Sequence, residues 1–194
     1  MSENKLTITA ICGSLREGSF NRRVLKAMEE LASKHWEIHH VDLSTIPLYN
    51  SDIESQGDPQ SVVEFKESIR KADGVLIVTP EYNMGIPGVL KNALDWASRP
   101  SKSSVLIQKP FAIAGATPGS GGTAQSQAQV RQTLLAMNAY TMVGPKVLIG
   151  SIHEKLNETT GELDDESTLR HLERFLTAFE EWILVFKQTQ KQKV

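Results

Sequence analysis

Residues 74–79 (GVLIVT) form a nearly continuous apolar run, and this run constrains the fold more than any other feature of the sequence. A strand with one wet face alternates polar and apolar residues, whereas a strand without alternation is covered on both faces, as in a parallel sheet. Apolar runs recur at residues 6–12, 36–43, 111–116, 140–143 and 147–149. The sequence therefore predicts a parallel sheet that helices cover on both sides.

Amphipathic segments separate these runs. Apolar residues recur at helical spacing in residues 21–31, after Pro59, and from residue 165 onward. Residues 87–98, which begin with a proline, and residues 122–138 are also expected to be helical. Strands that alternate with helices imply right-handed crossovers and a three-layer α/β sandwich. We expect a five-stranded parallel sheet of order 2-1-3-4-5. Its last strand, interrupted at Gly144-Pro145, should lie at an edge, because proline cannot donate a ladder hydrogen bond. One domain is expected over residues 1–194, with a core at about 6–186 and a polar tail at 187–194.

Charge and cysteine content argue against several functional classes. The 21 Lys and Arg residues nearly balance the 23 Asp and Glu residues, which gives a net charge of -2 and disfavours nucleic-acid binding. The single cysteine rules out an intramolecular disulfide, and a structural zinc site would need His and carboxylates alone. No apolar run approaches the length of a membrane span, and residues 1–5 lack a signal pattern. We therefore expect a cytoplasmic protein without bound metal, nucleic-acid partner or membrane insertion.

The loop after the first predicted strand offers groups that suit a phosphate. Ser14, Ser19 and Asn21 supply short polar side chains, Arg16 supplies a positive charge, and the following helix supplies its N-terminal N–H groups. The loop lacks the G-x-G-x-x-G spacing of dinucleotide folds and the Gly-Lys-Ser/Thr of a Walker A loop. A terminal monophosphate fits this loop better than a pyrophosphate, although a helix cap with incidental polar residues remains the alternative.

Two further loops should meet the first, because ligands of such sheets bind outside the carboxyl ends of the strands. Residues 79–88 contain two prolines and two glycines, which fix an irregular path, and Tyr82 adds an aromatic ring. Residues 115–122 are rich in small residues that allow the backbone to approach a ligand closely. Each loop alone could be an ordinary connection, but their convergence predicts one ligand site.

The motifs Gly-Ser-Leu-Arg-x-x-Ser-x-Asn at residues 13–21 and Pro-Glu-Tyr-Asn at residues 80–83 resemble those of the NADPH-dependent FMN reductase family. The resemblance continues through residues 87–96 (PGVLKNALDW) and covers nearly the whole chain. It implies a flavodoxin-like fold and tightly held FMN. The residues that it implies for the phosphate and ribityl end of FMN are Ser14, Arg16, Ser19, Phe20 and Asn21. Those implied for the isoalloxazine are Pro80, Glu81, Tyr82 and Asn83, with Ala116, Thr117 and Ser120 on the pyrimidine side.

The resemblance also implies an enzyme. Hydride would pass from NADPH or NADH to FMN and then to quinones, chromate, azo compounds or free flavin by a ping-pong mechanism, without a catalytic acid–base pair. Arg16 and Arg99 are candidates for the NADPH phosphates, and a homodimer or homotetramer is expected. Glu81 is a candidate for an ion pair with Arg99 or Arg131 of a neighbouring subunit. A flavodoxin-type electron carrier is the alternative. A receiver-type sensor is disfavoured, because the first strand ends without acidic residues.

Overall fold

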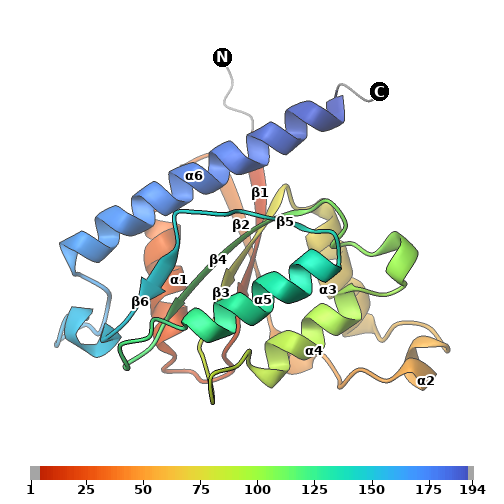
Figure 1. The fold of residues 1–194 in the computed structure, drawn as a ribbon, viewed down its shortest axis with the longest axis horizontal. Coiled ribbons are helices and arrows are strands. Elements are labelled where there is room, and N and C mark those ends of the chain that lie inside the picture. The colour runs from red at the N-terminus through yellow and green to blue at the C-terminus, as the bar shows by residue number, and fades with distance from the viewer. Residues whose placement is uncertain (1–4, 192–194) are drawn as a thin grey trace.

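The computed structural model describes residues 5–191, and its centre is a parallel sheet (Figure 1). The strand order is β2-β1-β3-β4-β5, and β6 also pairs with β4, so the predicted order is confirmed and one short strand is added. Register is set by pairs such as Ala10 with Leu76 and Leu76 with Ala112. The strands are β1 (Leu6–Cys12), β2 (Trp36–Val41), β3 (Gly74–Val78), β4 (Pro110–Ala116), β5 (Tyr140–Thr141) and β6 (Val147–Ile149).

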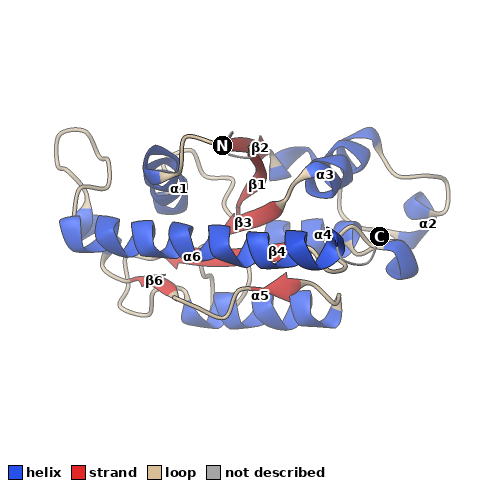
Figure 2. Cartoon of the chain, turned by 90° about the horizontal axis from the view of Figure 1, so that it is seen from above, coloured by secondary structure: helices blue, strands red, loops and turns tan. Residues whose placement is uncertain are grey.

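Helices cover both faces of the sheet, as the apolar run at residues 74–79 predicted (Figure 2). Two helices, α1 (Phe20–Leu31) and α6 (Glu166–Lys191), share one hydrophobic cluster with the sheet. The opposite face packs against α3 (Gln60–Lys71), α4 (Gly88–Ala97) and α5 (Ala124–Ala136). A short helix, α2 (Ser51–Glu54), and three 3-10 turns at Leu43–Thr45, Ser101–Ser103 and Ile152–Lys155 complete the fold. None of the helices within residues 5–191 is long and apolar enough to cross a membrane.

Gly74 explains how closely α6 packs on the sheet. A Cβ atom at this position would lie 2.6 Å from Ile183 Cδ1 and 2.8 Å from Phe179 Cζ, closer than real contacts allow. All five residues of β3 are buried between the two helical layers. Burial of this kind stabilises the fold by roughly 1.5–3 kcal/mol for each large apolar side chain.

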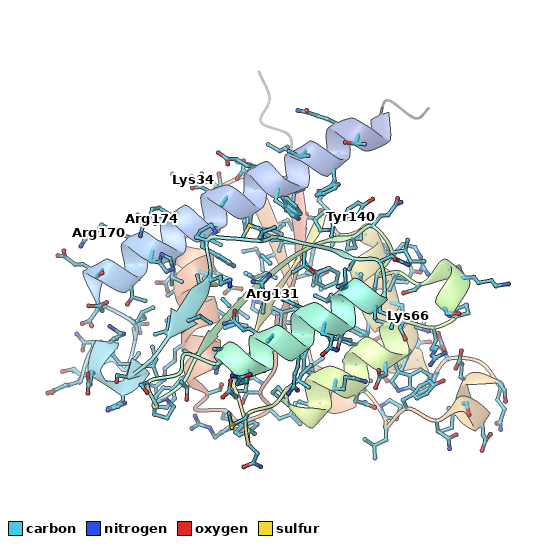
Figure 3. All side chains as sticks on the ribbon, in the orientation of Figure 1. Lys34, Lys66, Arg131, Tyr140, Arg170 and Arg174 are labelled. Atoms are coloured by element: carbon cyan, nitrogen blue, oxygen red, sulfur yellow. The ribbon has the colours of Figure 1, made fainter. Side chains whose placement is uncertain are left out.

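The edge of the sheet beside β5 and β6 is protected by side chains. The predicted interruption at Gly144-Pro145 separates β5 from β6, and each pairs with β4 on its own. Trp182 Nε1 donates to Tyr140 O at 2.9 Å, and Arg131, which projects from α5 (Figure 3), donates to Met142 O at 2.6 Å. Because these carbonyls already have donors, the edge offers less to an added strand.

The last helix is longer than the sequence pattern suggested. The polar segment from residue 187, expected to be a tail, continues α6 as far as Lys191, and residues 192–194 lie outside the described residues. Lys187 Nζ lies 2.7 Å from Asp73 Oδ1 at the start of β3, which ties this end of the helix to the sheet. The helix extends further because this tertiary ion pair compensates for the absence of an apolar pattern.

Candidate functional site

Three loops that were expected to share a ligand follow β1, β3 and β4, which are neighbours in the sheet. Their carboxyl ends are joined by hydrogen bonds from Gly13 N to Val78 O and from Thr79 N to Ala114 O, both 2.9 Å long. A Cβ at Gly13 would lie 3.0 Å from Thr79 Oγ1 and 3.2 Å from Pro80 Cδ. Glycine therefore lets the first two loops meet at this point.

The first loop buries its serine hydroxyls beneath an exposed arginine. Ser14 Oγ accepts a hydrogen bond from Arg16 N at 3.3 Å, and Ser19 Oγ accepts one from Asn21 N at 3.2 Å, capping α1. Both serines are almost fully buried. Since a hydroxyl that accepts a bond keeps its own proton, Ser14 can still donate to a ligand, and the Ser19 hydroxyl, which also interacts with the Cys12 thiol, would have to turn from that thiol to do so.

Positive charge gathers at the N-terminus of α1. The guanidinium of Arg16 lies 5.4 Å from the centre of the Phe20 ring, and that of Arg23 lies 5.8 Å from the same ring. Neither arginine forms an ion pair with another described residue, and the first turn of α1 contains no acidic residue. Uncompensated cations, hydroxyl donors and a positive helix end together fit the phosphate of FMN.

Asn21 is placed differently from the expectation of an open ligand donor. Its side chain is buried and forms two hydrogen bonds with the main chain of Ala116, donating from Nδ2 to the carbonyl at 3.0 Å and accepting from the N–H at 2.9 Å. This amide therefore braces the first loop against the end of β4. The N–H of Ala116 is already used, and only the contact surface of this residue remains for a ligand. Nothing in the sequence pattern indicates this pairing.

The second loop is a tight hairpin with an exposed tip. Tyr82 and Gly85 pair through two hydrogen bonds of 3.3 and 3.0 Å, and the two residues between them, Asn83 and Met84, have left-handed φ angles of 50° and 61°. Tyr82 is 55% exposed, whereas Pro80 is buried. The hairpin thus presents the Tyr82 ring at the carboxyl edge of the sheet.

Glu81 points to a neighbouring helix. Its Oε2 accepts hydrogen bonds from Gln125 N at 2.8 Å and Ser126 N at 3.0 Å, both in the first turn of α5. Within this chain, Arg99 lies over the Tyr49 ring and Arg131 donates to Met142 O. The expected ion pair between Glu81 and an arginine of a neighbouring subunit stays a prediction.

The third loop is held close to the sheet by its glycines. A Cβ at Gly115 would lie 2.0 Å from Thr123 Oγ1 and 2.3 Å from Thr79 O, so this position allows only glycine without rearrangement. Thr117 N donates to Ile149 O at 2.9 Å, and the Thr117 hydroxyl accepts from Gly119 N at 3.3 Å. Ser120 is exposed. The structure therefore brings Thr117 and Ser120 to the same edge as the other two loops, as expected.

Cys12, the single cysteine of the chain, lies at the end of β1. It is only half-buried and lines a cavity of about 360 Å³ together with Ser14, Arg22 and Asp42. Burial raises the pKa of its thiol, although the backbone at Ser14 and the charge of Arg22 oppose this effect. The thiol is thus a poor nucleophile at neutral pH.

Comparisons with known proteins agree with this geometry. The model of the family described as NADPH-dependent FMN reductase matches residues 6–154. A quinone reductase of Escherichia coli K12 is 43% identical over 185 residues, covering 94% of this chain and 97% of the relative. An NAD(P)H-dependent FMN reductase of Pseudomonas aeruginosa is 40% identical over 178 residues, with coverages of 92% and 95%.

A solved structure supports the same assignment. The flavoenzyme NAD(P)H:(acceptor) oxidoreductase FerB of Paracoccus denitrificans matches with a TM-score of 0.85 and 36% identity, over 93% of this chain and 98% of that chain. The family predicted from the loop motifs is confirmed, and this chain belongs to the NADPH-dependent FMN reductase family.

Proposed function

We propose that this protein is an FMN-dependent NAD(P)H oxidoreductase that reduces quinones by two electrons. The observation that carries the proposal is the N-terminus of α1, where two buried hydroxyls and Arg16, which forms no ion pair with another described residue, lie at a positive helix end. The names of the relatives, quinone reductase and NAD(P)H-dependent FMN reductase, support the same activity. When bound, FMN supplies the redox chemistry, taking electrons from NAD(P)H and passing them to the acceptor.

The residues of this chain then have separate tasks. The hydroxyls of Ser14 and Ser19 and the guanidinium of Arg16 hold the phosphate, with Phe20 beside them. The hairpin at residues 80–83 and the loop with Thr117 and Ser120 border the ring system, and Asn21 keeps the first and third loops in register. The exposed Tyr82 ring at this edge is suited to stacking against a planar substrate.

Several finer points belong to the same proposal. Chromate, azo compounds and free flavin are further acceptors, and the two half-reactions follow a ping-pong order. The protein works in the cytoplasm as a homodimer or homotetramer. The near-balanced charge and the single cysteine of the sequence support this setting. Each acceptor is small enough to approach an open carboxyl edge of the sheet.

Binding and turnover of the purified protein test the proposal. We expect one FMN per chain, rapid two-electron reduction on mixing with NADPH, and oxidation of NADPH when 1,4-benzoquinone is added.

Arg16→Gln should weaken FMN binding about tenfold, since it removes a charge-assisted hydrogen bond. Arg70→Gln, which removes an exposed arginine on α3 that pairs with Glu67, should not weaken it. A colourless protein that binds no FMN at micromolar concentration contradicts the proposal. Bound FMN with only slow NADPH oxidation indicates an electron carrier instead.

A further inference from the structure

The N-terminus of α5 opens toward the proposed flavin site, directly after the third loop. A helix of thirteen residues has a positive end that favours nearby negative charge. Thr123 occupies the cap position with a left-handed φ of 64° and makes no capping bond to the helix N–H groups through its side chain. Its hydroxyl accepts instead from Gln127 Nε2 at 3.1 Å. The helix therefore lacks a cap of its own.

Glu81 provides the missing cap from the second loop. A single carboxylate oxygen, Oε2, accepts from both Gln125 N and Ser126 N, at 2.8 and 3.0 Å. These are two of the N–H groups that a helix leaves without an intrahelical partner. The positive end of α5 is thus met by a negative charge that belongs to the chain itself.

Two further contacts hold the second loop and α5 together. Gln129 accepts from Ile86 N at 3.0 Å through Oε1 and donates to Met84 O at 3.2 Å through Nε2. Thr79 Oγ1 and Ser126 Oγ form a buried hydrogen bond of 3.2 Å. Together with Glu81, these contacts hold the second loop to α5 at three points. The position of the Glu81 carboxylate therefore does not depend only on its own two hydrogen bonds.

We propose that Glu81 is a positioning residue that tunes bound FMN through α5. The proposal rests on the proposed function, in which residues 80–83 and the third loop border the isoalloxazine. Reduced FMN carries more negative charge on its ring than oxidised FMN, and an uncapped helix end would stabilise that charge. The Glu81 carboxylate cancels this stabilisation. Reduced FMN is then bound less tightly relative to oxidised FMN, which leaves the bound cofactor a stronger electron donor.

Three variants separate charge from hydrogen bonding. Glu81→Gln keeps an oxygen acceptor for the two N–H groups but removes the charge, whereas Glu81→Asp keeps the charge on a shorter side chain. Glu158→Gln removes an exposed carboxylate with no described bonding partner, and it serves as the matched control for net charge.

The measurement is the ratio of the dissociation constants of reduced and oxidised FMN, determined anaerobically by titration of the apoprotein. In Glu81→Gln this ratio should fall about three- to tenfold, the range that a charge at a helix terminus supplies. A tenfold change in a two-electron couple corresponds to about 30 mV, here toward a more positive potential. Glu81→Asp should restore most of the wild-type ratio, and Glu158→Gln should leave it unchanged.

Hydrogen exchange of the apoprotein supplies a readout that needs no flavin. The amides of Gln125 and Ser126 should exchange faster in Glu81→Gln than in the wild type, because a neutral acceptor holds them less strongly. Faster exchange with an unchanged ratio would show that Glu81 is only a structural cap and would overturn the proposal. So would a ratio that moves in the opposite direction. Failure of the wild-type protein to bind oxidised FMN would instead contradict the proposed function, and with it the proposed role of Glu81.

Discussion

Two helix N-termini face the same edge of the sheet, and the chain treats them in opposite ways. At α1 the cap is the neutral Ser19, no carboxylate is present in the first turn, and Arg16 has no ion-pair partner among the described residues. At α5 the carboxylate of Glu81 accepts two N–H groups of the first turn. Both termini attract anions by the same physics. The terminus of α5 is already satisfied, whereas that of α1 is not, and this difference favours α1 as the proposed site for the phosphate of FMN.

Two glycines that precede these helices also differ in how much space surrounds them. A Cβ at Gly115, before α5, would meet Thr123 and Thr79 at 2.0–2.3 Å, whereas a Cβ at Gly18, before α1, would find its nearest neighbour, Arg16 Nη1, at 3.5 Å. The end of β4, which leads into the loop before α5, is therefore closely packed at Gly115. Gly18, in the loop before α1, has open space around it.

Replacement of these two glycines should show the largest effect. Gly115→Ala forces Thr123 and the backbone at Thr79 apart, and we expect a loss of about 3 kcal/mol in the free energy of unfolding. Gly18→Ala should change this free energy by less than about 0.5 kcal/mol, as expected for an exposed site. Urea denaturation of both variants measures the difference. Equal losses would show that these two positions are packed alike.

A carboxylate at the cap of α1 should convert it into a terminus like that of α5. Ser19→Asp retains a favoured capping residue, but it places a negative charge beside the expected phosphate. We expect the dissociation constant of FMN to rise about 100-fold through this repulsion. Ser19→Asn places a side chain of the same shape as Asp but without its charge, and it is the control for steric effects at this buried position. Fluorescence titration of FMN measures both, and similar losses in the two variants would argue against a phosphate at α1.

The smallest effect is expected at a third terminus, that of α6, which contributes no residue to the proposed site. Hydrogen bonds from the hydroxyl and the N–H of Thr168, at 2.5 and 2.9 Å, hold the pKa of Asp165 below its ordinary value. Because the folded-state pKa is lowered, the stabilisation is present above the unfolded-state value of about 3.9 and is lost as the pH falls through the folded-state value.

Asp165→Ala should therefore cost about 1 kcal/mol at pH 7, the usual contribution of a helix cap. The difference between the variant and the wild type should shrink as the wild-type carboxylate becomes protonated. Thermal unfolding at pH 7 and at pH 3 tests this, with FMN affinity unchanged in the variant. A difference that is independent of pH would mean that the carboxylate charge contributes nothing.

Part of this molecule could be predicted from local pattern. The apolar run at residues 74–79 indicated a strand buried on both faces, and β3 is one. The serines and the arginine at residues 14–19 predicted a phosphate loop; Ser19 does cap α1, and the phosphate itself stays a prediction. The length of α6 was underestimated, since the ion pair of Lys187 with Asp73 joins residues far apart in sequence.

The sequence by itself determined which strands are covered, the order in which they pair, and which three loops carry polar and small residues. All of these depend on neighbours within a few positions or on general rules of sheet connection. Only the tertiary structure decided that Asn21 braces Ala116 and that Glu81 caps α5. Each of these pairs joins segments that are distant in sequence and meet only after the sheet has assembled. The hydrogen bonds of Asn21 and Glu81 form only when these segments are correctly placed, because a hydrogen bond weakens when its atoms depart by a fraction of an ångström from ideal geometry.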